Sequence, residues 1–157
     1  MTNFEITLFV FLLSAFVIYN GFVWVKYGVQ KSISADIYVL TGPFEKSYYS
    51  LFILSMSIPM MILSDNTIGW WAGALLALDF AAPAGGDRMQ NFLHCFGADV
   101  GMGLGILMVG FVFHLWFLAG AFIVFSLIAT KWKNGVTWVE TAAFVTVYTG
   151  LLIHYLR

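Results

Sequence analysis

The sequence predicts an all-α, polytopic integral membrane protein, and its composition and hydropathy pattern support this class. Of the 157 residues, 61% are hydrophobic and only 10% are charged, far from the balance of a soluble domain. The mean hydropathy is +0.90. The apolar residues gather in runs close to the ~20 residues that a membrane-crossing helix needs. We therefore expect a single transmembrane bundle with helices at about 4–25, 48–64, 68–83, 90–111, 114–130 and 136–156.

The first apolar run is predicted to be a membrane helix and not a signal peptide. No basic segment precedes it, the run is too long for a signal sequence, and residues 20–24 make a poor cleavage site. The next connection, Lys26 to Ser47, is the only one with room for structure of its own. Its residues 32–36 are predicted to cap a short interfacial helix, with Tyr38 and Leu40 touching lipid headgroups.

The stretch 90–130 decides between six helices and five. One straight helix of this length would measure about 60 Å, twice the hydrocarbon thickness. We place a break at residues 113–116, where His114 and Trp116 follow an apolar run. Six helices collect all the lysines and Arg88 on one side, whereas five would move Lys131 and Lys133 to the other. The positive-inside rule thus favours six, with both termini outside the cytoplasm of a bacterial inner membrane, and five is the alternative.

The fourth predicted helix carries an ionisable residue near its middle. If this helix starts near Gln90, Asp99 lies about 13 Å along it, close to the bilayer midplane. A charged residue there costs roughly 2.5 to 3.5 kcal/mol even on a lenient scale, so a function or a partner usually accompanies it. We expect a buried polar site around Asp99, with Asn20 and Ser57 of other helices as candidate partners.

The same helix contains a regular row of small residues. Gly97, Gly101 and Gly105 repeat every four residues and predict close approach by another helix, within the bundle or at a subunit contact. His94 and Asp79 lie near the inner end of the bundle. They form either a solvated membrane border or a vestibule that leads to Asp99.

Several functions are excluded or disfavoured by the sequence. A net charge of −1 gives no basic surface for nucleic acid. His94 is predicted near the inner face and His114 and His154 near the outer face, so three ligands cannot converge and we expect no metal site. No motif calls for a cofactor. No set of serine, histidine and acid shares one depth, which argues against an enzyme. Cys95 is interpreted as a small packing residue.

The order of several short motifs resembles known membrane families. These motifs are Ser32-Ile33-Ser34 with Tyr38, Tyr48-Tyr49 with Pro59, Ala81-Ala82-Pro83, and His94 with Gly97-Ala98. The chain resembles small six-helix membrane proteins of unassigned function found in bacteria and their phages, and the six-helix Frag1/DRAM-like families. This resemblance implies a six-helix bundle and assigns no catalytic residue.

Three classes of function are left open. The preferred one is a protein that binds or transports a small solute, proton or cation at Asp99. The alternative is a structural membrane subunit that binds membrane lipids or partners, as a homo-oligomer or within a membrane complex. The third is an intramembrane lipid hydrolase, which the placement of the histidines disfavours.

Overall fold

The protein is built from helices. The computed structural model describes residues 2–40, 42–81 and 88–157, and within these ranges there is no β-strand. A short helix, α2 (Asp36–Val39), lies in the first connection, and a π-helix, η1 (Met108–Val112), continues α5. The six longer helices are α1 (Asn3–Tyr27), α3 (Pro43–Leu63), α4 (Thr67–Ala81), α5 (Arg88–Leu107), α6 (Trp116–Ala129) and α7 (Gly135–Leu156). The predicted all-α class is confirmed.

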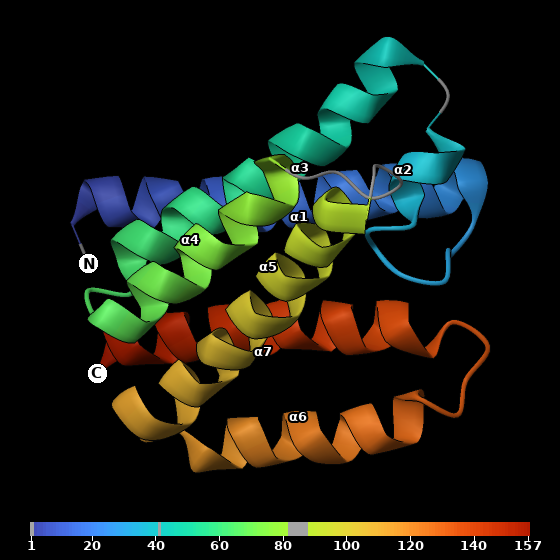
Figure 1. The fold of residues 1–157 in the computed structure, drawn as a ribbon. Helices are drawn as coiled ribbons and strands as arrows, with labels where there is room; N and C mark the ends of the chain where they lie inside the picture. Colours follow the sequence, from blue (N-terminus) through green and yellow to red (C-terminus); the bar gives the residue numbers. More distant parts are fainter. Residues whose placement is uncertain (1, 41, 82–87) are drawn as a thin grey trace.

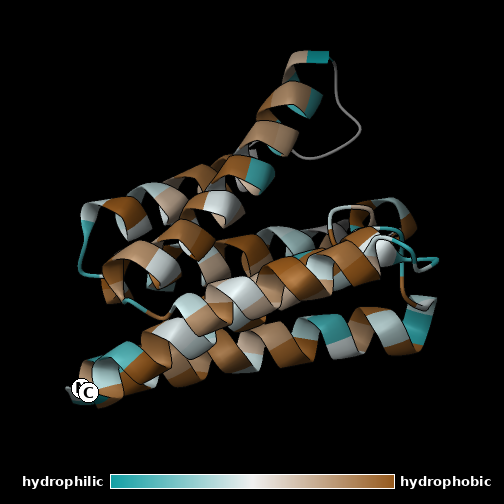
Figure 2. Cartoon of the chain, turned by 90° about the horizontal axis from the view of Figure 1, so that it is seen from below, coloured by the Kyte–Doolittle hydropathy of each residue, from teal (hydrophilic) through white to brown (hydrophobic). Residues whose placement is uncertain are grey.

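Length and composition identify the helices suited to a membrane. Three helices are long and apolar enough to cross one: α1, α5 together with η1, and α7. The other three contribute shorter apolar segments, at Ser47–Leu63, Thr67–Leu78 and Trp116–Ala129. Successive long helices run in opposite directions, and the two termini lie at the same end of the molecule (Figures 1 and 2).

The ends of α1 follow from local sequence. At its start, the Glu5 amide donates to the Thr2 hydroxyl while the Thr2 amide donates to the Glu5 carboxylate, a reciprocal capping box. At its end, Gly28 takes a φ of 78°, a left-handed conformation that stops the helix at little steric cost.

The connection after α1 is held against the start of α7. The Thr137 hydroxyl donates to the Gln30 carbonyl at 2.6 Å, and the Asn134 amide donates to the Val29 carbonyl at 2.8 Å. The Ile33 amide donates to the Glu140 carboxylate. The first connection and the turn between α6 and α7 therefore lie at the same end of the bundle.

The interior and much of the outer surface are both apolar. In the interior, Met56, Met60 and Met108 are at most 1% exposed, and the Tyr148 hydroxyl donates to the Met56 sulfur. On the outside, Val25 is 90% exposed and Ile18 69% exposed. Brown, hydrophobic residues accordingly appear all round the helices in Figure 2. A surface this apolar suits a chain whose solvent is lipid.

The break between the fourth and fifth predicted helices lies where the sequence placed it. Residues 113–115 separate η1 from α6, and His114 has a φ of 56°. The Leu115 amide donates to the Val109 carbonyl, which satisfies one backbone group at the end of η1. The Phe113 ring stacks on His154, with 4.3 Å between the ring centroids, and so ties the break to α7.

Two glycines of the predicted row pack inside the chain. A Cβ added at Gly101 would lie 3.0 Å from backbone atoms of Ala72 and Leu76 in α4. One added at Gly105 would meet side chains of Met60 and Val147 at less than 3.0 Å. Glycines of this row therefore allow α5 to pack closely against α4, α3 and α7 within one chain.

We expect Gly101→Ala to destabilise the fold by about 1 to 3 kcal/mol, because backbone atoms of α4 cannot move aside as a flexible side chain can. The matched control is Gly120→Ala in α6, where an added Cβ meets nothing within 4 Å. Unfolding in mixed detergent micelles measures both. Equal stability of the two variants would contradict the close packing of α5 on α4.

Candidate functional site

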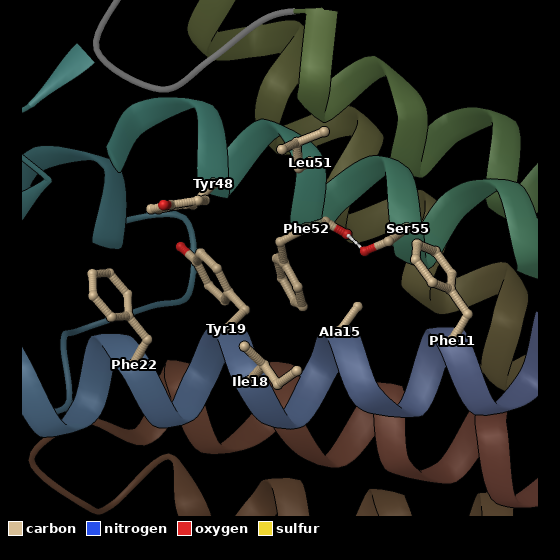
Figure 3. A pocket seen from close by; sticks show the side chains of 9 residues that line it. All are labelled: Phe11, Ala15, Ile18, Tyr19, Phe22, Tyr48, Leu51, Phe52 and Ser55. Carbon is tan, nitrogen blue, oxygen red and sulfur yellow. Dashed lines mark hydrogen bonds between the residues drawn. The ribbon is translucent and has the colours of Figure 1, made fainter. Parts of the chain in front are cut away.

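An open cavity lies between α1 and α3. Its volume is about 590 Å³, and its lining is almost entirely apolar and aromatic. In Figure 3 the side chains of Phe11, Ala15 and Ile18 rise from α1 while Phe52 hangs from α3 into the same space. The lining residues are Phe11, Ala15, Ile18, Tyr19, Phe22, Tyr48, Leu51, Phe52 and Ser55. We call this cavity the α1–α3 groove.

Aromatic contacts set the shape of the groove. The Tyr19 ring stacks on Phe52 with 4.2 Å between centroids, and Phe22 meets Tyr48 edge to face at 5.8 Å. The one serine of the lining, Ser55, donates its hydroxyl proton to the Phe52 carbonyl. Since this proton is already used inside α3, the groove suits a hydrocarbon better than a polar solute.

A polar cluster lies at the Phe22 end of the groove. Lys26 forms an ion pair with Glu45, and the Tyr27 hydroxyl donates to the same carboxylate at 2.8 Å. The Glu45 carboxylate also accepts from the Gly42 amide at 3.0 Å. The Lys26 nitrogen is 5.4 Å from the centroid of the Phe22 ring. The groove thus passes from aromatic walls to charge at this end.

Tyr19 connects the groove to a buried acid in α2. Its ring forms part of the groove wall, while its hydroxyl acts on the carboxyl of Asp36. Asp36 is only 1% exposed, and burial raises the pKa of its carboxyl to about 7, against the opposing effect of the Tyr19 hydroxyl. A group with this pKa changes charge near neutral pH.

Asp99 does not occupy the interior site that the sequence predicts. It lies on the exposed outer side of α5. The expectation that Asp99 is buried within the chain is therefore wrong. The physical reason is that Gly97, Gly101 and Ala98 occupy the inward side of this helix, where their small size allows close packing.

Two candidate partners of Asp99 are buried and bonded within their own helices. Asn20 is 3% exposed and donates to the Phe16 carbonyl at 2.8 Å, and its side-chain oxygen has no hydrogen-bond partner among the described residues. Ser57 is fully buried and donates to the Ile53 carbonyl at 2.7 Å. These bonds satisfy the donors locally, as is common for polar side chains within membrane helices.

The remaining predicted residues have separate positions. His94 is buried on α5, at 5% exposure. Asp79 belongs to α4, but its side chain lies outside the described residues, as do Ala82 and Pro83. Within the described ranges, no three His, Cys, Asp or Glu side chains group as a metal site requires.

The first connection combines a confirmed expectation with a correction. A short helix is present there, as predicted, and Tyr38 is 64% exposed. Leu40 is only 1% exposed, so its predicted contact with headgroups is wrong; the residue belongs to the hydrophobic core. Cys95 likewise lies on the outer surface and is not a packing residue of the interior.

Sequence reasoning missed the groove and the role of Asp36. The sequence held a signal for Asp36, because the apolar residues 37–39 follow it directly. When such a segment packs against the core, it can carry the carboxyl into an apolar environment. The groove had no comparable signal, since α1 is apolar on every side.

The helical fold and the apolar outer surface are those of an α-helical membrane protein. Comparison with known protein families, curated proteins and solved structures gives no match. The resemblance to the six-helix families therefore stays a prediction, and the site must be interpreted from its own chemistry.

We expect the stability of the protein to fall as the pH rises from about 4 to about 7. The pKa of Asp36 in the folded state, about 7, exceeds its ordinary value of 3.8, so the folded state holds a proton that the unfolded state loses. The slope reaches about 1.4 kcal/mol per pH unit. Unfolding in detergent across this range measures it.

Asp36→Asn is expected to remove this contribution to the slope, because the amide does not ionise. The control is Asp65→Asn, which changes an exposed carboxylate in the turn after α3 and should keep the slope. A slope that survives Asp36→Asn unchanged would show that another group is responsible.

Proposed function

We propose that this protein is a six-span membrane subunit that binds the hydrocarbon chain of a lipid in the α1–α3 groove. The observation that carries this proposal is the open cavity of about 590 Å³ with aromatic walls on the outer side of two apolar helices. The side chains of the described residues leave this space unfilled. In a bilayer, the molecules in contact with such a surface are lipids.

The length of the groove matches a lipid chain from one leaflet of the bilayer. Along α1 the groove extends from Phe11 to Phe22, about 16 Å at the rise of a helix. This length is close to half of the ~30 Å hydrocarbon thickness. Its charged end, at Lys26 and Glu45, then lies at the level of the headgroups. An acyl chain extended along α1 matches both features.

Charge and contact support six crossings. Lys26 lies in the last turn of α1, and Lys31 lies in the connection that Asn134 and Thr137 hold by hydrogen bonds. Lys131 and Lys133 lie in the turn between α6 and α7. The basic residues at the end of α1 and in two separate connections thus share one end of the bundle. The positive-inside rule assigns that end to the cytoplasm and the termini to the opposite side.

Lipid binding accounts for the structure better than transport at Asp99 does. A transport pathway within one chain needs ionisable groups that face its interior or a water-filled cavity. Asp99 faces outward, and the described cavity beside α1 is apolar. A subunit that holds a lipid needs neither an interior charge nor a polar pathway.

We expect Ala15→Trp to reduce lipid occupancy of the groove several-fold, because an indole at this position fills the space between α1 and Phe52. The matched control is Val17→Trp, on an exposed face of α1 that does not line the groove. The measurement is photocrosslinking in proteoliposomes to phosphatidylglycerol that carries a diazirine in its acyl chain, with mass spectrometry of the labelled peptides. Labelling spread evenly over all exposed apolar faces would contradict a specific groove.

We expect Glu45→Gln to increase the preference of the groove for phosphatidylglycerol over phosphatidylcholine. In the native protein Glu45 neutralises Lys26, so the charged end is close to neutral overall. Removal of the carboxylate leaves a cation near the headgroup, worth about 1 kcal/mol or a few-fold in affinity. Competition between the two lipids in the same crosslinking assay measures the ratio. The double variant Lys26→Gln with Glu45→Gln should return the ratio to that of the native protein.

A further inference from the structure

α5 presents an uninterrupted exposed row along its outer side. Cys95, Asp99, Gly103 and Leu107 follow one another at intervals of four residues, and all are exposed; Phe111 of η1 continues the row. Residues spaced in this way lie above one another on a helix. The row is separate from the buried glycine row, which packs within the chain.

If lipid were the only neighbour of this row, the Asp99 carboxylate would have a high free-energy cost. From Arg88, the start of α5, to Asp99 the helix rises about 16 Å, which places the carboxyl near the bilayer midplane. A charged residue at that depth costs roughly 2.5 to 3.5 kcal/mol or more, and such residues almost always pair or face a protein interior. The outer side of α5 is therefore expected to contact another protein molecule and not lipid alone.

The chain has no cation that reaches this depth. Every lysine and arginine of its sequence lies at a helix end or in a connection between helices. The complementary group for a carboxylate in hydrocarbon is then a hydrogen-bond donor of a neighbouring molecule at the same depth.

We propose that this face binds a second copy of the chain, α5 against α5, about a two-fold axis along the membrane normal. Both copies insert in the same orientation, so each Asp99 meets the Asp99 of the other copy at equal depth. Where the two carboxylates meet, they take up one proton from water between them, and the O–H···O⁻ hydrogen bond that results leaves one negative charge for the pair in place of two.

The rest of the row allows this approach. A Cβ added at Gly103 would meet nothing within 4 Å, so the helix surface one turn from Asp99 is open to another backbone. Cys95, one turn to the other side, is also small. Cys95 and Gly103 lie one turn to either side of Asp99. Small residues at a contact let membrane helices approach closely, and hydrogen-bonding side chains strengthen such contacts. The same surface supplies both features to each partner, as a two-fold contact requires.

The inference depends on α5 crossing the membrane, and it does not depend on the lipid groove. The groove is formed by α1 and α3, whereas the row belongs to α5 and η1. Loss of lipid binding in Ala15→Trp would leave the dimer intact, and loss of the dimer would leave the groove intact. The two proposals therefore fail separately.

Cys95 provides a direct test because it is the only cysteine of the chain. We expect copper–phenanthroline oxidation of the native protein in proteoliposomes to give a disulfide-linked dimer at high yield. The matched control is Cys95→Ser with Val124→Cys, which moves the thiol to an exposed position near the middle of α6. Equal crosslinking from the two positions would indicate random collision and overturn the proposal.

Energy transfer between labelled copies in lipid tests the role of Asp99. Asp99→Leu is expected to raise the dimer dissociation constant tenfold or more, whereas Asp99→Asn should keep most of the affinity because amides also hydrogen-bond across the axis. Since Asp99 is exposed in the single chain, neither substitution disturbs the core. An unchanged dissociation constant for Asp99→Leu would overturn the proposal.

A cationic helix is the competing occupant, and the same assay distinguishes it. A synthetic poly-leucine helix with one central lysine serves as the probe, with the all-leucine helix as its control. If the protein stays monomeric in lipid and captures only the lysine helix, the face belongs to a cationic partner and the second copy is ruled out. If the copies pair and neither helix displaces them, the proposal stands.

Discussion

A polar group that this chain carries into hydrocarbon must find its partner within protein, and the rest of the structure depends on this constraint. Helices satisfy their backbone groups internally, which is why the described chain is helical throughout its apolar segments. Polar side chains follow the same requirement. Ser55, Ser57 and Asn20 each donate to a carbonyl of their own helix within one turn. The donors of these three side chains are therefore satisfied within their own helices, and van der Waals packing holds the neighbouring helices against them.

Close packing of this kind requires small residues where helices meet. Gly73 is such a residue at the contact of α4 with α3. A Cβ added there would lie 2.7 Å from the backbone oxygen of Ser57. Gly101 plays the same part between α5 and α4, and Gly150 packs against Val109 between α7 and η1. In lipid, where burial of apolar surface gives helices no advantage over contact with acyl chains, such approaches are a main source of stability.

The same requirement explains the two surfaces that the folded chain leaves unmatched. The α1–α3 groove lacks atoms to fill it, and lipid can supply them. Asp99 lies on the exposed side of α5, away from the described interior, and in the proposed dimer a second copy supplies its partner. Tyr19 adds a connection between the groove and Asp36, an acid whose pKa of about 7 lies near physiological pH. In the arrangement proposed above, the groove, the polar connection and the outer face of α5 assign lipid contact, pH sensitivity and assembly to different elements.

The sequence by itself determined the all-α class of the protein and the break at residues 113–115, whereas α3 begins at Pro43, five residues before its predicted start. These features depend on local composition, turn residues and helix length, which any stretch of sequence carries within itself. The sequence also identified Asp99 as costly and in need of a partner. It did not determine that Asp99 faces outward, that Leu40 is buried, or that α1 and α3 leave a groove between them. Only the tertiary structure decided these points, because a membrane helix is apolar toward lipid and toward protein alike. Hydrophobicity therefore cannot show which face turns inward, and small residues and shape complementarity between neighbouring helices make that choice.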